Sequence, residues 1–398
     1  MDEKNFEALV IGGGIAGIAV AYAFAKRKQK VLLVERNSYL ASEASGNPSG
    51  MVYPFLTKKE SIDSIFSLKA FDYVHSILPK LSQKISLKTG AFLLPRTSEE
   101  ESRYHGAKIQ YNLKEEDLVS AKDPNSGRDG FFFSKAICLS PPQLIEALRM
   151  QCGEFLSIEY DTEINKYVSP DISSIKWKDT EINFKYLIFA QANEMKSFGC
   201  LDWLPFRKVR GQIVLLPKRK ALSHLSCAYL FGDYLTPDLG HGSVLGASFD
   251  EYHFDESPRE SETIEFLHSA RKNLPFLEET IDELLKTKES ILPRVSFRSQ
   301  SQDRRPSFGI LPNAKLLQRI QNELPKPQQV KNIEIPRFQN TFLLGSLGSR
   351  GLTHALLAGE WIVKSIYNEL SSEEESIFKE FLPERFLIRA WKQGRLFA

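Results

Sequence analysis

Three glycines near the N-terminus have the spacing that binds the pyrophosphate of a dinucleotide. Gly12, Gly14 and Gly17 form a G-x-G-x-x-G pattern. In this pattern the first glycine permits a tight turn, the second lets the backbone approach the pyrophosphate, and the third lets a helix pack closely on a strand. Glu35 follows about twenty residues later, where an acidic side chain can accept hydrogen bonds from a ribose diol. These residues predict a site for the ADP half of a dinucleotide.

The segments around these glycines predict a Rossmann unit. Residues 6–11 are a short, mostly apolar run typical of a buried parallel strand. Residues 15–26 predict an alanine-rich helix whose N-terminus would present N–H groups and a positive dipole end to phosphates. Residues 30–35 (KVLLVE) predict a second strand that ends in the acid. The residues expected to bind the cofactor here are Gly12, Gly14, Ile15, Ala16, Gly17, Glu35 and Arg36.

Composition and charge place the chain among ordinary soluble proteins of two-domain size. It has 398 residues, of which 42% are hydrophobic and 26% charged, and its net charge is +2 at pH 7. This balance excludes a strongly basic nucleic-acid binder, so any contact with an anionic polymer must come from local patches. The four cysteines are far apart, without a CxxC pair or a histidine at metal-ligand spacing. We therefore predict free thiols and no metal site.

An apolar run near the N-terminus has almost the length of a membrane span. Residues 8–25 are all apolar or glycine. They follow Asp2 and Glu3 instead of a basic segment, and they contain three consecutive glycines, each costing roughly 1 kcal/mol inside a helix. A strand, a turn and a buried helix explain the run better. We therefore expect no signal peptide, no membrane segment and a cytoplasmic location.

Signals of the nucleotide-binding sheet recur in the middle and at the end of the chain. Residues 185–190 (KYLIFA) and 341–344 (TFLL) predict buried strands, and the second is followed by a glycine-rich segment and a helix over about 352–370. Antiparallel-looking strands are predicted at residues 212–217, 229–236 and 243–249. Helical periodicity covers residues 261–285, with an interruption at Pro275. The two kinds of sheet alternate along the chain, so no single cut separates two domains.

Two segments carry a specific family resemblance. Residues 44–54 (ASGNPSGMVYP) resemble the ASGN…G…YP signature of the MnmC oxidoreductase domain, and residues 345–352 (GSLGSRGL) resemble its ALGSRGL segment. Less specific matches lie at residues 233–237, 245–248 and 382–394. The likeness runs from about residue 6 to the C-terminus. That domain is the FAD-dependent half of a bifunctional tRNA-modifying enzyme and belongs to the glycine oxidase/D-amino-acid oxidase flavoprotein superfamily.

The resemblance implies an α/β fold in which a Rossmann-type FAD-binding domain is interleaved with an antiparallel-sheet substrate domain. We expect the FAD-binding domain at residues 1–80, 138–203 and 293–398, and the substrate domain at residues 81–137 and 204–292. In the bifunctional enzyme this domain follows a methyltransferase domain, and we find no such module in this sequence. The resemblance therefore implies an oxidation step, whose product a separate methyltransferase could use.

The implied substrate is 5-carboxymethylaminomethyl-uridine, often 2-thiolated, at the wobble position of tRNA. Its side chain is an N-substituted glycine. Hydride removal from the glycyl methylene would give an imine, which hydrolyses to glyoxylate and an aminomethyl-uridine. Two alternatives remain. The first is a small-molecule amine oxidase or dehydrogenase acting on glycine, sarcosine or a D-amino acid, which would have the same fold and cofactor. The second is a non-catalytic FAD-binding subunit.

Three residues are candidates for the reacting site. Arg298 lies where the superfamily places a carboxylate-binding arginine after a strand, and a guanidinium can hold a carboxylate through two parallel hydrogen bonds. The resemblance places Arg350 where a positive charge would stabilise the anionic reduced flavin, and Tyr234 where a tyrosine faces the substrate. The alternatives are a surface position for Arg298, a helix-capping loop around Arg350 and core packing for Tyr234.

The two resemblance segments add further expected contacts with FAD. Ser45, Gly46 and Asn47 would line the pyrophosphate or ribityl region, with a simple surface turn as the alternative. The second segment would bring backbone N–H groups to the pyrimidine edge of the flavin. Its expected FAD contacts are Gly348, Ser349, Arg350, Gly351 and Leu352.

Basic residues near the C-terminus form a candidate contact with tRNA. Their spacings of three and four would place them on one face of a helix; they are Arg385, Arg389, Lys392 and Arg395. Residues 218–220 (KRK) form a second small cluster. A solvated helix face is the alternative. If the cluster binds phosphates, affinity should fall steeply with salt because counterions are released.

Overall fold

Two compact units make up the chain, and both are discontinuous in sequence. Unit 1 comprises Met1–Ser42, Leu148–Lys208 and Arg298–Ala398, and unit 2 comprises Glu43–Ala147 and Val209–Phe297. The chain passes between the units within α4 (Pro141–Cys152), β10 (Phe206–Leu216) and β14 (Leu292–Ser301). This computed structural model describes residues 4–114, 116–164, 170, 172–177, 180–287, 290–323 and 334–394. Residues 43–80 group with unit 2, whereas the sequence analysis placed them with the FAD-binding domain. The division by ligand stays a prediction.

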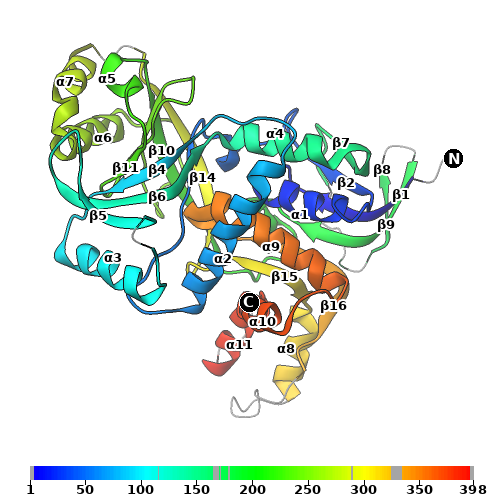
Figure 1. Cartoon of the computed structure of the whole chain (residues 1–398). Coiled ribbons are helices and arrows are strands. Elements are labelled where there is room, and N and C mark those ends of the chain that lie inside the picture. Colours follow the sequence, from blue (N-terminus) through cyan, green and yellow to red (C-terminus); the bar gives the residue numbers. More distant parts are fainter. Residues whose placement is uncertain are drawn as a thin grey trace. The chain divides into compact units, whose positions relative to one another are not determined.

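A seven-stranded sheet forms the centre of unit 1. Its order is β15-β16-β9-β1-β2-β7, and β8 pairs with β9. The strands are β1 (Lys4–Ile11), β2 (Val31–Val34), β7 (Leu156–Glu159), β8 (Ser174–Trp177), β9 (Thr180–Phe189), β15 (Ser307–Pro312) and β16 (Arg337–Gly345). The neighbours from β16 to β7 are parallel. Blue β1, green β9 and orange β16 therefore join the beginning, middle and end of the chain in one sheet (Figure 1). The strands predicted in these three regions are confirmed.

Two helices pack closely together on one face of this sheet. They are α1 (Ile15–Ala25) and α9 (Gly351–Ile366). A Cβ added at Gly359 of α9 would lie 2.8 Å from the carbonyl carbon of Ala19 in α1, so the small side chains permit a close approach. The helix predicted over about residues 352–370 was too long, because α9 ends at Ile366. The remaining helices of unit 1 are α8 (Ala314–Glu323), α10 (Ser372–Lys379) and α11 (Glu384–Lys392).

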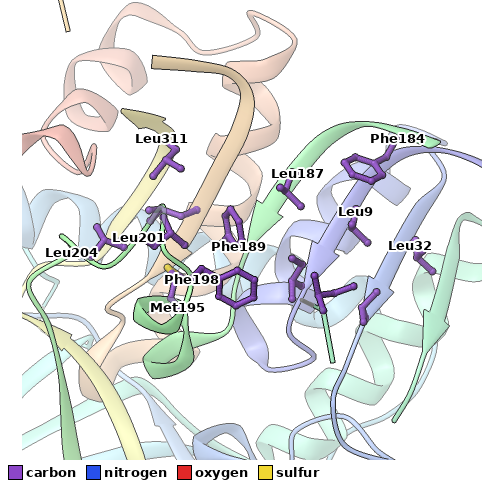
Figure 2. Close-up of a cluster of buried hydrophobic side chains, with 14 of the residues drawn as sticks. Leu9, Leu32, Phe184, Leu187, Phe189, Met195, Phe198, Leu201, Leu204 and Leu311 are labelled. Atoms are coloured by element: carbon purple, nitrogen blue, oxygen red, sulfur yellow. The ribbon is translucent and has the colours of Figure 1, made fainter. Parts of the chain in front are cut away.

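The other face of the sheet is covered by a cluster of large apolar side chains. Val10 faces α1, since its Cγ1 would lie 3.4 Å from a Cβ at Gly17, and strand alternation turns Leu9 to the opposite face. Leu9 joins Leu187 and Phe189 in a buried cluster (Figure 2). Burial of such side chains stabilises a fold by about 1.5–3 kcal/mol each. The strand β1, which ends at the glycine turn, is thus packed against α1 on one face and against the apolar cluster on the other.

A nine-stranded sheet forms the centre of unit 2. Its order is β14-β10-β13-β12-β11-β4-β6-β3, and β5 pairs with β6. Its other strands are β3 (Gly50–Val52), β4 (Leu87–Leu93), β5 (Leu118–Lys122), β6 (Asp129–Leu139), β11 (Ala228–Leu230), β12 (Tyr234–Leu235) and β13 (Ser243–Gly246). The helices are α2 (Ile62–Ile77), α3 (Ser98–Gln110), α5 (Lys220–Ser223), α6 (Glu260–Asn273) and α7 (Glu278–Thr287). The predicted interruption at Pro275 is confirmed, because it separates α6 from α7.

One strand prediction in unit 2 is wrong. Residues 229–236 form two short antiparallel strands, β11 and β12, and not one strand. Gly232 has a φ of +104° in the turn between them, a conformation that glycine adopts without steric cost. Apolar residues on both sides of this glycine led to the prediction of one continuous strand.

Candidate cofactor and substrate site

The turn after β1 depends on glycines for space. Gly12 has a φ of +111°, and a Cβ there would lie 2.7 Å from the carbonyl oxygen of Ala190. A Cβ at Gly17 would lie 1.8 Å from the carbonyl oxygen of Gly12, far inside van der Waals contact. Gly14 caps α1 in an extended conformation with no side-chain hydrogen bond at the cap. This close backbone approach at a helix N-terminus is the arrangement that binds a pyrophosphate.

Glu35 holds the glycine turn in place. Its side chain is buried, and its Oε2 accepts a 2.7 Å hydrogen bond from the N–H of Gly13. Its Oε1 accepts hydrogen bonds from the backbone and side-chain nitrogens of Asn37, at 2.9 and 2.7 Å. Oε2 has a second lone pair, so contact with a ribose hydroxyl stays a prediction. Arg36 lies 3.9 Å from Glu194, and its cofactor role also stays a prediction.

Gly13 is needed for space, which the motif alone did not indicate. A Cβ there would lie 2.8 Å from Glu35 Oε2 and 2.5 Å from a methyl group of Leu40. The same carboxylate therefore accepts from the Gly13 N–H and excludes any side chain at Gly13. The triplet in the sequence was a signal for this position, since its middle glycine has no task in the G-x-G-x-x-G pattern.

The segment after β16 meets the N-terminus of α1. The 3₁₀ turn η7 (Gly348–Arg350) leads into α9, whose first residue is Gly351. A Cβ at Gly351 would lie 3.5 Å from the Cγ2 of Ile15, the first residue of α1. The N-termini of the two helices therefore lie together, and their dipoles add positive potential at one place. Ser349 is exposed and Leu352 is partly buried; both remain expected FAD contacts.

A buried amide beside the glycine turn fits a polar ligand. Gln191 follows β9, and its backbone nitrogen would lie 3.1 Å from a Cβ at Gly12. Its Oε1 and Nε2 are both buried and have no hydrogen-bond partner among the residues that the structure describes. A buried polar group left in this state costs about 1–3 kcal/mol. The hydroxyls and phosphates of a bound dinucleotide would supply partners, so the residues present fit FAD. Gln191 was not among the residues expected to bind the cofactor.

Arg350 is the cation at the start of α9, next to a histidine that stays neutral. Burial, together with the nearby charge of Arg350, lowers the pKa of His354 to about 3. His354 therefore carries no charge near neutral pH. Positive charge at this helix end comes from Arg350 and from the helix dipole.

Arg298 lies inside a strand. It is partly buried in β14, whereas the sequence analysis placed it after a strand. Arg298 and Arg350 both belong to unit 1, as do Glu35 and the glycine turn. Strand residues are held more firmly than loop residues, which suits an anchor that must orient a carboxylate. Its role stays a prediction.

The ASGN segment is held by an arginine that was not among the residues expected to form the site. Ser45 and Gly46 lie in the 3₁₀ turn η1 (Ala44–Gly46), followed by Asn47. Arg294 Nη1 donates a 2.6 Å hydrogen bond to Asn47 Oδ1, and its Nη2 donates a 2.7 Å hydrogen bond to the carbonyl oxygen of Glu43. The contact joins residues 247 positions apart, so no local pattern could reveal it.

Tyr234 lies in β12 of unit 2, opposite Leu230 of β11 and Gly246 of β13. Its side chain is partly buried. Both roles considered for it, substrate contact and packing, are compatible with this position.

The C-terminal basic residues do not form one solvated face. Arg385 is largely buried, and its Nε lies 3.0 Å from Asp303 Oδ2. Burial would raise the pKa of Asp303, but hydrogen bonding and the charge of Arg385 hold it below its usual value. Arg389 is exposed and lies 3.2 Å from the same carboxylate, and Lys392 is exposed. Arg395 lies outside the described residues. The candidate tRNA face of α11 is thus reduced to Arg389 and Lys392.

The second basic cluster is partly engaged as well. Lys218 and Lys220 are exposed, whereas Arg219 lies 3.6 Å from Glu283.

In the described part of the chain, no helix is long and apolar enough to cross a membrane. Nor do these residues contain a group of three or more His, Cys, Asp or Glu side chains that could hold a metal ion.

The sequence matches one family over most of its length. The family model described as DAO, FAD dependent oxidoreductase, matches residues 7–365. Curated relatives include the "tRNA 5-methylaminomethyl-2-thiouridine biosynthesis bifunctional protein MnmC" of Leptospira interrogans serogroup Icterohaemorrhagiae serovar Lai (strain 56601), which is 27% identical over 96% of this chain and 60% of the relative. The protein of the same name from Pseudomonas fluorescens (strain Pf0-1) is 28% identical over 98% of this chain and 60% of the relative. The chain thus spans about three fifths of their length.

Solved structures share the fold at low sequence identity. Glycine oxidase from Geobacillus kaustophilus superposes with a TM-score of 0.71 at 17% identity, covering 94% of this chain and 98% of the other. L-proline dehydrogenase from P. horikoshii also gives a TM-score of 0.71, at 15% identity, covering 99% of this chain and 100% of the other. These likenesses confirm the predicted α/β fold class and do not define a substrate.

Proposed function

Because this chain belongs to the DAO family of FAD-dependent oxidoreductases, we propose that it oxidises the modified wobble uridine of tRNA. The proposed substrate is 5-carboxymethylaminomethyl-uridine or its 2-thio form, and the products are 5-aminomethyl-(2-thio)uridine and glyoxylate. The observation that carries the proposal is the match to relatives named for tRNA thiouridine biosynthesis over 96–98% of this chain. The ASGN and GSLGSRGL segments support it.

The reaction is an oxidation at a CH–NH bond followed by hydrolysis. When bound, FAD supplies the acceptor for a hydride. The substrate loses that hydride from its glycyl methylene and a proton from its nitrogen, which leaves an imine. Water then adds to the imine, and the carbon–nitrogen bond breaks to release glyoxylate. No dedicated base is required if the secondary amine is bound neutral.

The residues of unit 1 would divide the binding of FAD between them. Gly12, Gly14 and Gly17 would admit the pyrophosphate to the N-terminus of α1, and Glu35 would keep the turn in shape while facing the ribose. The start of α9 and Arg350 would stabilise negative charge on the reduced ring. Because His354 is neutral, this stabilisation does not change with pH near neutrality.

Arg298 would hold the carboxylate of the substrate side chain. Two parallel hydrogen bonds from one guanidinium fix both oxygens of a carboxylate and so fix the adjacent methylene. Tyr234 would contact the substrate. Ser45, Gly46 and Asn47 would line the pyrophosphate or ribityl region, with Arg294 holding Asn47 in position.

The test is anaerobic reduction of the purified flavoprotein by two kinds of substrate. One sample receives tRNA that carries carboxymethylaminomethyl-uridine, and the other receives free glycine or sarcosine. Loss of the visible flavin absorption reports hydride transfer, and glyoxylate is measured in the same samples. A third sample with tRNA that lacks the modification is the control for binding without reaction.

The outcomes separate the readings. Rapid loss of absorption with modified tRNA alone, together with glyoxylate, would support the proposal. Reduction by the small amines alone would place the enzyme with the amine oxidases of its fold. No reduction by any of them would favour a non-catalytic FAD-binding subunit.

We also propose a cytoplasmic location, where tRNA is available, and a separate methyltransferase acting on the aminomethyl product.

A further inference from the structure

The strand that carries Arg298 also carries a glutamine beside the α9 turn. Gln300 lies two residues beyond Arg298 in β14, so the two side chains leave the same face of the strand about 7 Å apart. Gln300 forms an isolated β-bridge with Leu347. Its side-chain carbons Cγ and Cδ would lie 4.0 Å from a Cβ added at Gly348. The amide of Gln300 therefore lies against the turn that opens α9.

The side-chain amide oxygen of Gln300 is a buried acceptor. Gln300 Oε1 is buried, and none of the described residues donates a hydrogen bond to it. A buried acceptor in this state is destabilising, so a ligand that brings a donor gains affinity. The donor must reach the space beside Gly348, at the N-terminus of α9.

The chemistry of the flavin ring limits which donor this can be. The pyrimidine edge of the oxidised ring presents two carbonyl oxygens, with a single N–H group, at N3, between them. Backbone N–H groups at a helix N-terminus suit the carbonyl oxygens. The N–H at N3 requires an acceptor instead, and the helix N-terminus has none to offer.

We propose that Gln300 Oε1 accepts the hydrogen bond from flavin N3–H and fixes the pyrimidine edge at the start of α9. Gln300 is then a positioning residue: it aligns the ring with Arg298, which leaves the same face of the same strand. This inference depends on FAD as the cofactor and not on tRNA as the substrate. Its failure and the failure of the proposed function are therefore distinguishable.

The test compares two cofactors in two proteins. Apoprotein is prepared from the wild type and from Gln300→Met, which keeps the length of the side chain and removes the acceptor. Each is titrated with FAD and with N3-methyl-FAD, which lacks the donor, and flavin fluorescence gives the dissociation constants. Gln302→Met, at the exposed position two residues further on, is the matched control.

The wild type should bind N3-methyl-FAD about tenfold more weakly than FAD, the change expected for one hydrogen bond at a buried site. Gln300→Met should bind FAD about tenfold more weakly and should not discriminate between the two cofactors. The Gln302→Met control should discriminate as the wild type does. Equal discrimination by wild type and Gln300→Met would overturn the proposal.

A second variant covers the case in which Gln300→Met does not fold. Gln300→Glu keeps an acceptor at the same distance and adds negative charge. It should retain the preference for FAD, and the midpoint potential of the bound flavin should fall, because the added charge opposes an anionic reduced ring. A potential equal to that of the wild type would show that the side chain is remote from the flavin and would also overturn the proposal.

Discussion

Two turns in unit 1 follow parallel strands and open neighbouring helices, yet they are shaped in different ways. In the turn after β1, the backbone itself fills the space: a Cβ at Gly17 would lie 1.8 Å from a carbonyl oxygen. In the turn after β16, a Cβ at Gly348 would meet side-chain atoms of Gln300 at 4.0 Å and no other atom of the described residues within that distance. Gly348 is needed there for its φ of +55° and not for space.

This difference separates a fixed part of the cofactor site from an adjustable one. A backbone carbonyl group cannot move aside as a side chain can, so no side chain is tolerated at Gly12 or Gly17. A turn limited by side chains can be altered through those side chains, here that of Gln300. We expect the first turn to determine whether FAD binds, and the second to determine how its ring is placed and charged.

The largest effect is expected from Gly17→Ala. The new methyl group would force α1 away from the turn and should lower the free energy of unfolding by about 3 kcal/mol, with loss of FAD binding. Thermal unfolding with and without added FAD measures both. Gly351→Ala in α9 is the matched control: its methyl group makes an ordinary 3.5 Å contact. The control should change stability by less than about 1 kcal/mol, and equal effects of the two would contradict the comparison.

Arg298→Ala should affect the reaction and leave the first turn intact. Loss of the carboxylate anchor should lower kcat/KM by about 100-fold, because the methylene is no longer held in position. FAD content should stay at the wild-type level. Stopped-flow reduction of the flavin by modified tRNA gives the rate, and Arg304→Ala, at an exposed position, is the control. A kcat/KM within about twofold of the wild type would remove Arg298 from its proposed role.

His354, near the start of α9, should make the free energy of unfolding depend on pH. Burial lowers its pKa to about 3, from an unfolded value of about 6.5. Between these values the unfolded chain binds a proton that the folded chain does not. The free energy of unfolding should therefore fall as the pH falls through this window, by at most about 1.4 kcal/mol per pH unit from this residue. Above about pH 6.5 the contribution is constant.

Urea unfolding of the wild type and of His354→Gln between pH 5 and 7 checks this effect. The variant should show the smaller slope with pH. The exposed His268 provides the control substitution His268→Gln, which should keep the wild-type slope. If His354→Gln also kept it, the buried histidine would not be the source of the dependence.

The smallest effect is expected on the surface of α11. Replacing both Arg389 and Lys392 with alanine should weaken tRNA binding and reduce the steepness of its salt dependence, by a slope of about 1.5 for two lost phosphate contacts. FAD binding should not change. Filter binding at several salt concentrations measures the slope. Lys379→Ala serves as the control, since Lys379 pairs with Glu375 on α10; unchanged binding by the double variant would exclude this face.

Much of unit 1 could be predicted because its signals are local. Gly12 and Gly17 are five residues apart, and the contact between them is made by the backbone, so their types alone indicate the turn. Where a prediction failed, the cause lay at a distance or in a single residue. Arg385 fits a helical stripe of cations, but Asp303, 82 residues away in sequence, holds it in the interior. Gly232 divides one apolar run into two strands.

The sequence by itself determined the family, the fold class and FAD as the cofactor, because they depend on short patterns with steric or electrostatic causes. Only the tertiary structure decided which side chains are already engaged and which buried polar atoms have no partner among the described residues. Arg294 reaches Asn47, and Glu35 binds Gly13, through contacts made only when the chain is folded. The buried amides of Gln191 and Gln300 became visible for the same reason. A hydrogen bond that is missing inside the protein can be recognised only when every neighbour is in place.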